Sequence, residues 1–94
     1  MLVTHPVSYI PLAGSGVVKA GPGDFYGIVV IASTTAILQV WDNATAGSGV
    51  LLYASVTALT AGQVITFNGI AIKAKNGLFL TLVSGTGTFN VLFD

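Results

Sequence analysis

The sequence predicts an all-β protein: a single antiparallel β-sandwich, jelly-roll-like, of seven or eight strands, with an extended N-terminal arm. Two observations support this fold class. From Asp24 onward, short runs rich in Val, Ile, Thr, Phe and Tyr follow one another, bounded by Gly, Asn and Asp. Nowhere do apolar residues keep a helical period over the roughly 10 to 12 positions that a helix requires. The length, 94 residues, is enough for one domain.

The N-terminal segment differs from the rest because it contains all three prolines. Proline removes backbone donors and favours extended conformations in the preceding residue. We therefore expect an extended arm over residues 1–23, with a short strand at 16–20, followed by a β-sandwich domain over 24–94. The arm is too apolar for a free tail, so we expect it to contact a neighbouring subunit. Its candidate contact residues are Val3, Val7, Tyr9, Ile10 and Leu12.

The strands are expected at residues 25–33, 36–42, 50–56, 63–67, 69–75, 78–84 and 88–93. Successive side chains of a strand point to opposite faces of the sheet, so alternation between residues 70 and 93 assigns a core face. The residues expected to face inward are Ile70, Ile72, Leu78, Leu80, Leu82, Phe89, Val91 and Phe93. The pair Asn76–Gly77 predicts a type I′ turn that joins the strands at 69–75 and 78–84.

Residues 28–31 are apolar on both faces of their strand. Such a strand is usually buried on both sides. In a protein of two layers, one of these sides must be covered by something outside the sandwich core. Val29 and Ile31 are therefore candidate residues for an interface with another protein; a loop or the N-terminal arm folded over the strand is the alternative.

A weak internal repeat places residues 26–42 over residues 78–94 without a gap. Each copy has an apolar strand, a Ser/Thr/Gly segment, and a second strand that ends in an aromatic residue and Asp. Duplication of one unit and ordinary turn chemistry both explain the pattern, since Ser, Thr and Gly favour turns. In either case the sequence predicts two β-hairpins, one in each sheet.

Charge is scarce in this chain. Charged residues make up 6% of it, against roughly 25% in an average soluble domain. The formal net charge is zero, which argues against direct binding of nucleic acid. No apolar run reaches the roughly 20 residues of a spanning helix, and the N-terminus does not have the pattern of a signal peptide. Proteins near zero net charge tend to associate, so we infer that other protein covers much of the surface.

The sequence offers little for catalysis. It has no Cys and no Glu, and its single histidine, His5, lies in the expected arm. General acid–base chemistry needs titratable groups placed together, so we predict neither enzymatic activity nor a cofactor or metal site. Asp42–Asn43 has the oxygens of a Ca²⁺ site, but an Asx-type turn is the simpler interpretation. The glycine-rich stretches lack the lysine and the following helix that a phosphate loop has, so we expect them to form turns.

Two further groups of residues have two interpretations each. Trp41, Tyr53 and Tyr26 form either a stacking platform for a sugar or a base, or filling for the core or an interface. Lys73 and Lys75 are expected on one face of a strand, as exposed charges that discourage pairing between sheet edges.

The order of these segments resembles small β-sandwich proteins of tailed bacteriophages, capsid decoration (cement) proteins among them. "STTAILQVWDN", "ATAGSGVLLYAS" and above all "IKAKNGLFLTLVSGTGTFNVLFD" carry the likeness, which covers residues 17–94. The resemblance implies a structural virion protein on the outer surface of the capsid. It would bind the major capsid protein, often as a homotrimer, and stabilise contacts between capsid subunits. A tail or baseplate component and a glycan-binding adhesin module are the alternatives.

Overall fold

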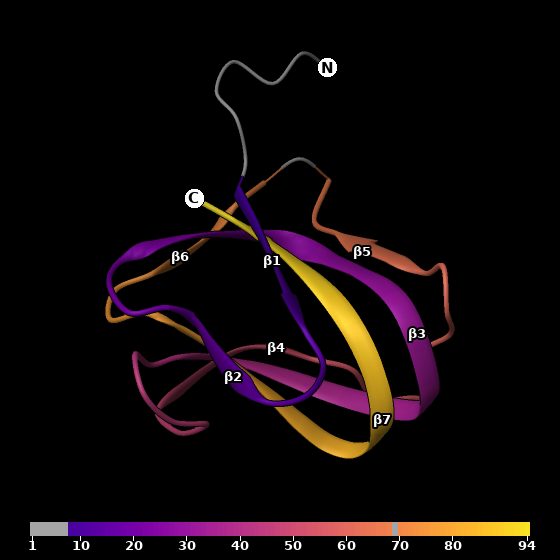
Figure 1. Ribbon diagram of the computed structural model, residues 1–94. Helices are drawn as coiled ribbons and strands as arrows, with labels where there is room; N and C mark the ends of the chain where they lie inside the picture. Colours follow the sequence, from indigo (N-terminus) through magenta and orange to yellow (C-terminus); the bar gives the residue numbers. More distant parts are fainter. Residues whose placement is uncertain (1–7, 69) are drawn as a thin grey trace.

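The protein is described from a computed structural model, which covers residues 8–68 and 70–94. It forms one antiparallel sheet of seven strands that folds over on itself into two layers (Figure 1). The strands are β1 (Ser8–Leu12), β2 (Gly16–Lys19), β3 (Gly23–Asp42), β4 (Val50–Ala54), β5 (Val64–Thr66), β6 (Ile72–Ala74) and β7 (Leu78–Phe93). These residues contain no helix. The predicted fold class, an all-β sandwich-like protein of seven or eight strands, is confirmed.

Two long strands, β3 and β7, form the centre of the sheet. They pair antiparallel from Trp41 opposite Phe79 to Phe25 opposite Phe93. The prediction of two separate hairpins is therefore wrong, because each copy of the repeat is a single bent strand and the copies pair with each other. Ser, Thr and Gly make a bend here, not a turn: Thr35 (φ 53°) and Gly85 (φ 76°) take left-handed backbone angles where the register shifts.

The bend divides the sheet into two layers that face each other (Figure 1). The upper layer contains β1, the C-terminal half of β7, the N-terminal half of β3, and then β5 and β6. The lower layer contains β2, the N-terminal half of β7, the C-terminal half of β3, and β4. Both layers are thus built on one half of each long strand.

The core lies between the layers and is apolar. Of the residues expected to face inward, Leu78, Leu80, Phe89 and Val91 are fully buried. Ile72, Leu82 and Phe93 are partly buried and pack against this core. The prediction for Ile70 is wrong: its side chain is 67% exposed, because the strand begins only at Ile72 and residue 70 lies in the preceding turn.

The predicted type I′ hairpin at Asn76–Gly77 is also wrong. Strand β6 pairs with β3 and not with β7, so residues 75–77 connect two strands that are not partners. The φ of Gly77 is not left-handed; the glycine is needed for space. A Cβ there would lie 2.7 Å from the Cα of Ala44 and 2.7 Å from the carbonyl oxygen of Lys19.

The segment expected to be an arm supplies two strands to the sheet. In β1, residues from Ser8 to Leu12 pair with β7 from Phe93 to Phe89. In β2, Val18 is buried in the core. The segment is extended, as its prolines predict, and its described part belongs to the same globule as the rest.

Candidate functional site

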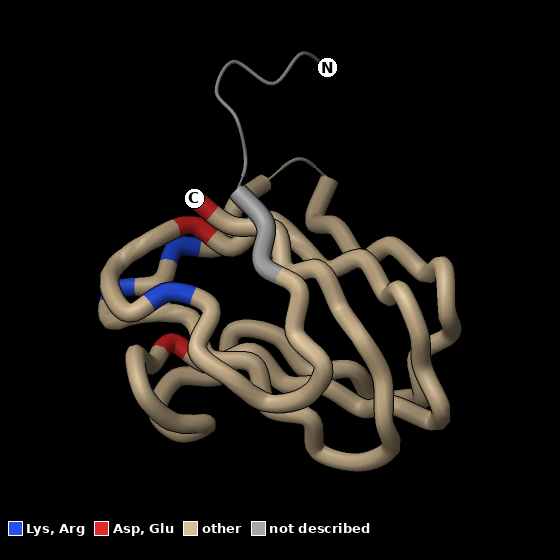
Figure 2. Tube along the Cα trace, viewed as in Figure 1, with Lys and Arg blue, Asp and Glu red and all other residues tan. Residues whose placement is uncertain are grey.

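The charged side chains of this protein gather at one place. All three lysines and two of the three aspartates line a single open pocket of about 580 Å³. Figure 2 shows these residues at the edge of the molecule opposite the bend of β3 and β7. We call this site the charged pocket. Its lining residues are Lys19, Pro22, Gly23, Asp24, Lys73, Ala74, Lys75 and Asp94.

Strand pairing places the two sides of the charged pocket against each other. In the β3–β6 pairing, Gly23 lies opposite Ala74 and Asp24 lies opposite Lys73. Opposite charges across two strands stabilise a sheet by roughly 0.2–1 kcal/mol. The backbones of Asp24 and Asp94 exchange two hydrogen bonds, each 2.8 Å long, which fix the end of β7 beside the start of β3.

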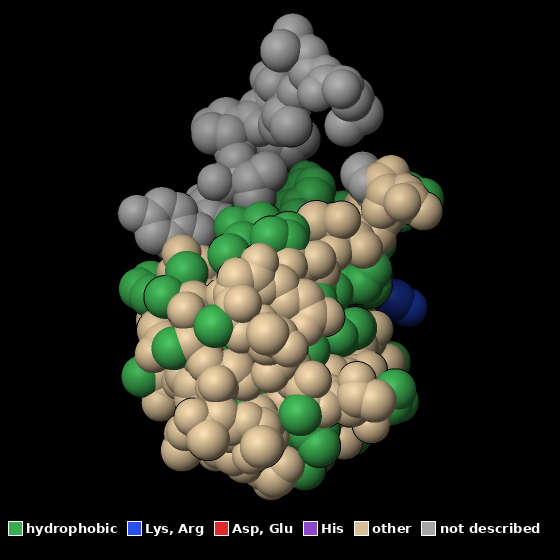
Figure 3. Space-filling model, turned by 90° about the vertical axis from the view of Figure 1, so that its right-hand side faces the viewer, with side chains coloured by type: hydrophobic (Ala, Val, Ile, Leu, Met, Phe, Trp, Pro, Cys, Tyr) green, Lys and Arg blue, Asp and Glu red, His purple; other side chains and the backbone are tan. Residues whose placement is uncertain are grey.

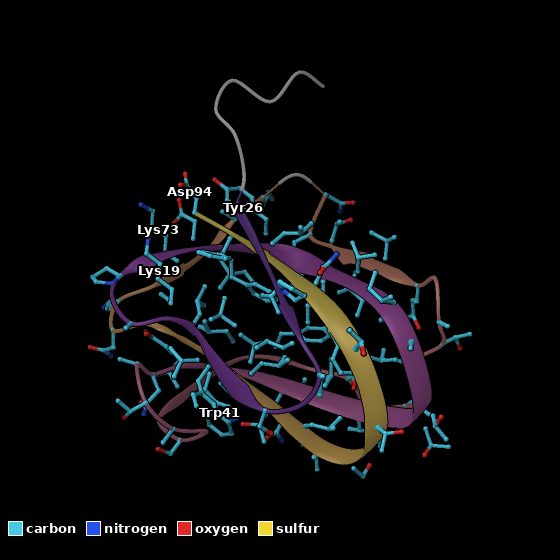
Figure 4. All side chains as sticks on the ribbon, viewed as in Figure 1. Lys19, Tyr26, Trp41, Lys73 and Asp94 are labelled. Carbon is cyan, nitrogen blue, oxygen red and sulfur yellow. The ribbon has the colours of Figure 1, made fainter. Side chains whose placement is uncertain are left out.

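Gly23 determines where the Lys19 side chain lies. A Cβ at residue 23 would be 2.8 Å from Cδ and 3.0 Å from Nζ of Lys19. The lysine therefore lies over the backbone of β3, and it is half-buried. Figure 4 shows Lys19, Lys73 and Asp94 at the same end of the molecule, with Tyr26 close by.

The pKa of Tyr26 is affected by the two carboxylates beside the charged pocket. Burial raises the pKa of its hydroxyl, and the negative charges of Asp24 and Asp94 raise it further. A tyrosinate would be disfavoured next to two carboxylates, so Tyr26 stays neutral at physiological pH.

The sixth charged residue, Asp42, has a structural role. Its Oδ2 accepts a hydrogen bond from the backbone N–H of Lys75 (3.0 Å), and its Oδ1 accepts from Asn76 (2.7 Å) and Gly77 (3.3 Å). These bonds, that of Lys75 first, lower the pKa of the Asp42 carboxyl, and the Lys75 charge adds to them. Asp42 therefore fixes the backbone of one lysine of the charged pocket.

Asn43 forms the predicted Asx-type turn. Its Oδ1 accepts hydrogen bonds from the backbone N–H groups of Thr45 (2.9 Å) and Ala46 (3.0 Å). Because backbone groups already occupy the oxygens of Asp42 and Asn43, the structure does not support a Ca²⁺ site at this pair. Within residues 8–68 and 70–94, no three His, Cys, Asp or Glu side chains lie together as metal ligands do.

The candidate interface residues have separate locations. Ile31 is 52% exposed, and Val29 is half-buried on the face opposite the fully buried Ile28 and Val30. Leu12 is partly buried against the core. The backbones of Tyr9 and Ile10 lie in β1, whereas Val3, Val7 and also His5 lie outside the described residues.

The three aromatic residues do not form a common platform. Tyr53 packs inward and makes an edge-on contact with Phe67, with 6.0 Å between ring centroids. Burial raises the pKa of its hydroxyl. Trp41 lies in the lower layer, far from Tyr26 in Figure 4, and its indole N–H donates to Oε1 of Gln39 (3.2 Å).

Trp41 instead belongs to an outward-facing apolar row that crosses the lower layer. In the pairings of β2, β7, β3 and β4, Val17 is opposite Phe79, Phe79 is opposite Trp41, and Trp41 is opposite Leu51. Val17 and Leu51, at the two ends, are exposed. A large part of the remaining surface is similarly uncharged. Figure 3 shows the face at the bend, where apolar side chains are scattered among polar and backbone atoms and Lys appears only at the margin.

The sequence alone did not indicate the charged pocket. Lys73 and Lys75 were expected to be edge charges, and nothing connected them with Lys19, Asp24 or Asp94. The sequence did not show that β6 pairs with the start of β3. The hairpin predicted at Asn76–Gly77 would instead pair this strand with β7. The signal available was compositional: five of six charges lie in 19–24, 73–75 and residue 94.

Comparisons with known proteins identify no relative: no protein family, no curated protein and no solved structure matches this chain. The described residues also include no helix with the length and apolar character to cross a membrane.

Proposed function

We propose that this protein is a structural component of a virus particle and that it acts by surface contact, not by catalysis. The observation that supports this most strongly is the distribution of charge. Five of the six charged side chains line one pocket, and the sixth, Asp42, binds backbone N–H groups. None of the large exposed apolar side chains of the described surface lines that pocket; they are Val17, Ile31, Val50, Leu51, Val56, Val64, Ile70 and Val83.

A surface of this kind is suited to contact with protein over a broad area. Interface cores contain few charged residues, because a charge buried without a partner must lose its hydration. Exposed apolar residues such as Ile31 and Leu51 lose that exposure when another protein covers them, at about 25 cal/mol per Å² removed from water. Association therefore stabilises both the contact and this small domain.

The more specific part of the proposal rests on the resemblance to small β-sandwich proteins of tailed phages. We propose a capsid decoration, or cement, protein on the outer surface of the head, bound to the major capsid protein as a homo-oligomer, with a trimer favoured. A protein that bridges neighbouring capsid subunits stabilises the closed shell by binding to it. No enzymatic step and no direct contact with nucleic acid or membrane is part of this function.

A tail or baseplate component would share all of these features and is the main alternative. The glycan-binding alternative has less support. Sugars stack on exposed aromatic rings, but Tyr53 packs against the core and Trp41 and Tyr26 lie apart.

Sedimentation velocity of the wild type and of Ile31→Lys tests the proposal. Ile31 is 52% exposed, so the lysine should leave the fold intact but place an unpaired charge in a contact, and the variant should shift toward monomer. Thr57→Lys is the control, because Thr57 is an exposed polar residue in a loop and its substitution adds the same charge without replacing an apolar surface residue. A wild type that stays monomeric at high concentration and does not pellet with phage heads would refute the proposal.

A further inference from the structure

We infer that the charged pocket binds an acidic side chain, Asp or Glu, that a partner protein presents to it. The inference rests on the proposed function, because it assigns a chemistry to one contact that the protein makes in its assembly. Three features support it: the convergence of the lysines, the two carboxylates beside them, and the open shape of the pocket.

The lysines converge from separate parts of the chain. Lys19 ends β2, and Lys73 and Lys75 lie in and just after β6, more than fifty residues away in sequence. No other cationic side chain of Lys or Arg exists in the protein. Three like charges brought together repel one another, and a bound anion relieves this repulsion. Asp24 and Asp94 offset only two of the three charges.

Protection of a sheet edge does not explain this arrangement. Lysines on edge strands discourage unwanted pairing, and Lys73 alone would fit that role. Such a lysine extends into solvent. Lys19 instead is half-buried and lies over Gly23, where its Nζ would be 3.0 Å from a Cβ at that residue. The glycine thus gives space for a third cation to lie in the charged pocket.

The two aspartates limit which kind of anion the charged pocket can bind. The charged side chains that line the pocket sum to one positive unit, which suits a single carboxylate, and a carboxylate makes strong charge-assisted hydrogen bonds with ammonium groups. A bound carboxylate brings the sum of these side-chain charges to zero, whereas a phosphate dianion would leave one uncompensated negative charge beside Asp24 and Asp94. A nucleic acid would need a basic surface along its backbone, and this chain has only three lysines.

The shape of the pocket indicates a group carried by a protein. Sites for free small molecules bury 70–90% of the ligand, whereas the charged pocket is more open than enclosed. Beside it, β6 pairs only with β3, so its second edge is unpaired among the described strands. An extended segment of a partner can lie along such an edge while its acidic side chain enters the pocket.

Titration of the ¹⁵N-labelled full chain with the peptide acetyl-Gly-Glu-Gly-amide tests the inference. The matched control is acetyl-Gly-Gln-Gly-amide, which has the same shape without the charge. We expect the Glu peptide to shift the amide signals of Gly23, Asp24, Ala74 and Lys75, with saturation in the millimolar range. Equal shifts with both peptides, or shifts spread over the whole protein, would refute the inference.

Two variants that change the charge of the pocket in opposite directions provide a second test. A unit charge about 6 Å away in water changes affinity about threefold. Lys73→Gln should therefore weaken binding of the Glu peptide about threefold, and Asp24→Asn should strengthen it by a similar factor. A role of these residues in folding alone would not produce changes in opposite directions. Unchanged affinity in both variants would contradict the inference.

Sodium phosphate and sodium glucuronate serve as competing probes. Tighter binding of phosphate would refute the assignment to a carboxylate, and tighter binding of glucuronate would refute a protein source in favour of an acidic sugar. The sedimentation experiment gives a separate result. Selective binding of the Glu peptide by a protein that never assembles would refute the proposed function and leave the pocket's chemistry supported.

Discussion

Thr34 and Thr86 lie directly opposite each other where β3 and β7 bend together. The same two threonines are equivalent in the internal repeat, which places residues 26–42 over 78–94. The two copies are therefore antiparallel partners, related by an approximate local two-fold axis that passes between these residues. The flanking strands follow this symmetry: β1 and β4 lie at equivalent edges, as do β2 and the pair β5 and β6.

The bend depends on Gly85, and we predict that Gly85→Ala lowers the free energy of unfolding by about 1–3 kcal/mol. Gly85 has a φ of 76°, and a Cβ there would collide with the carbonyl oxygens of Thr34 and Thr35. Urea unfolding followed by the fluorescence of Trp41, the single tryptophan, measures the change.

Gly21→Ala is the matched control for that experiment. Its φ is not left-handed, and a Cβ there would meet nothing within 4 Å, so stability should change little. Equal stability of the Gly85→Ala variant and the wild type would show that the bend does not need a left-handed residue at this position.

Substitution of Ile70 and of Ile72 tests whether strand β6 begins at residue 72 and not earlier. Ile72→Ala should destabilise the protein by about 1–3 kcal/mol, because Ile72 packs against the core and its truncation removes apolar contacts. Ile70→Ala should have an effect within about 0.5 kcal/mol, because Ile70 is 67% exposed. Urea unfolding of both variants decides. Similar losses for the two would mean that both side chains face inward and that the strand begins earlier.

Asp42 should make stability depend on pH in the acid range. Its carboxyl has a pKa below the ordinary 3.8, so it contributes stability above that pH, and this contribution is lost as pH falls through the folded-state value. We predict that Asp42→Asn costs about 1–3 kcal/mol at pH 7 and that its difference from the wild type shrinks from about pH 5 to about pH 2.

Ile72→Ala is the control for this dependence, because it destabilises the protein without removing a titratable group, so its difference from the wild type should stay constant with pH. Urea midpoints at several pH values give the comparison. A constant gap between Asp42→Asn and the wild type from pH 7 to pH 2 would contradict the assigned role of the carboxylate.

Much of the fold could be predicted because period-2 alternation is a local signal. Alternation correctly assigned Leu78, Leu80, Phe89 and Val91 to the core. The partners of each strand could not be predicted, because turn residues do not distinguish a reversal from a bend. Ser33 to Thr35 and Ser84 to Gly87 have the composition of turns, yet each lies within one continuous strand.

The charged pocket could not be predicted for the same reason. Its two sides meet because β6 crosses to the start of β3 and because the end of β7 pairs with Asp24. These contacts join residues 47 or more positions apart, and alternation contains no information about them. For Ile31 the local pattern, apolar residues on both faces of one strand, left open whether a partner, a loop or the arm covers the outer face; in the structure Ile31 is 52% exposed.

The copy number of this protein in purified particles tests the proposed structural role most directly. Quantitative mass spectrometry of particles from a lysate in which the chain is produced from its own genome would compare it with the major capsid protein. We predict that the protein is abundant in these particles, in a fixed ratio to the capsid subunit that is the same from one preparation to the next. Its absence from particles, while it is present in the same lysate, would contradict the proposed function.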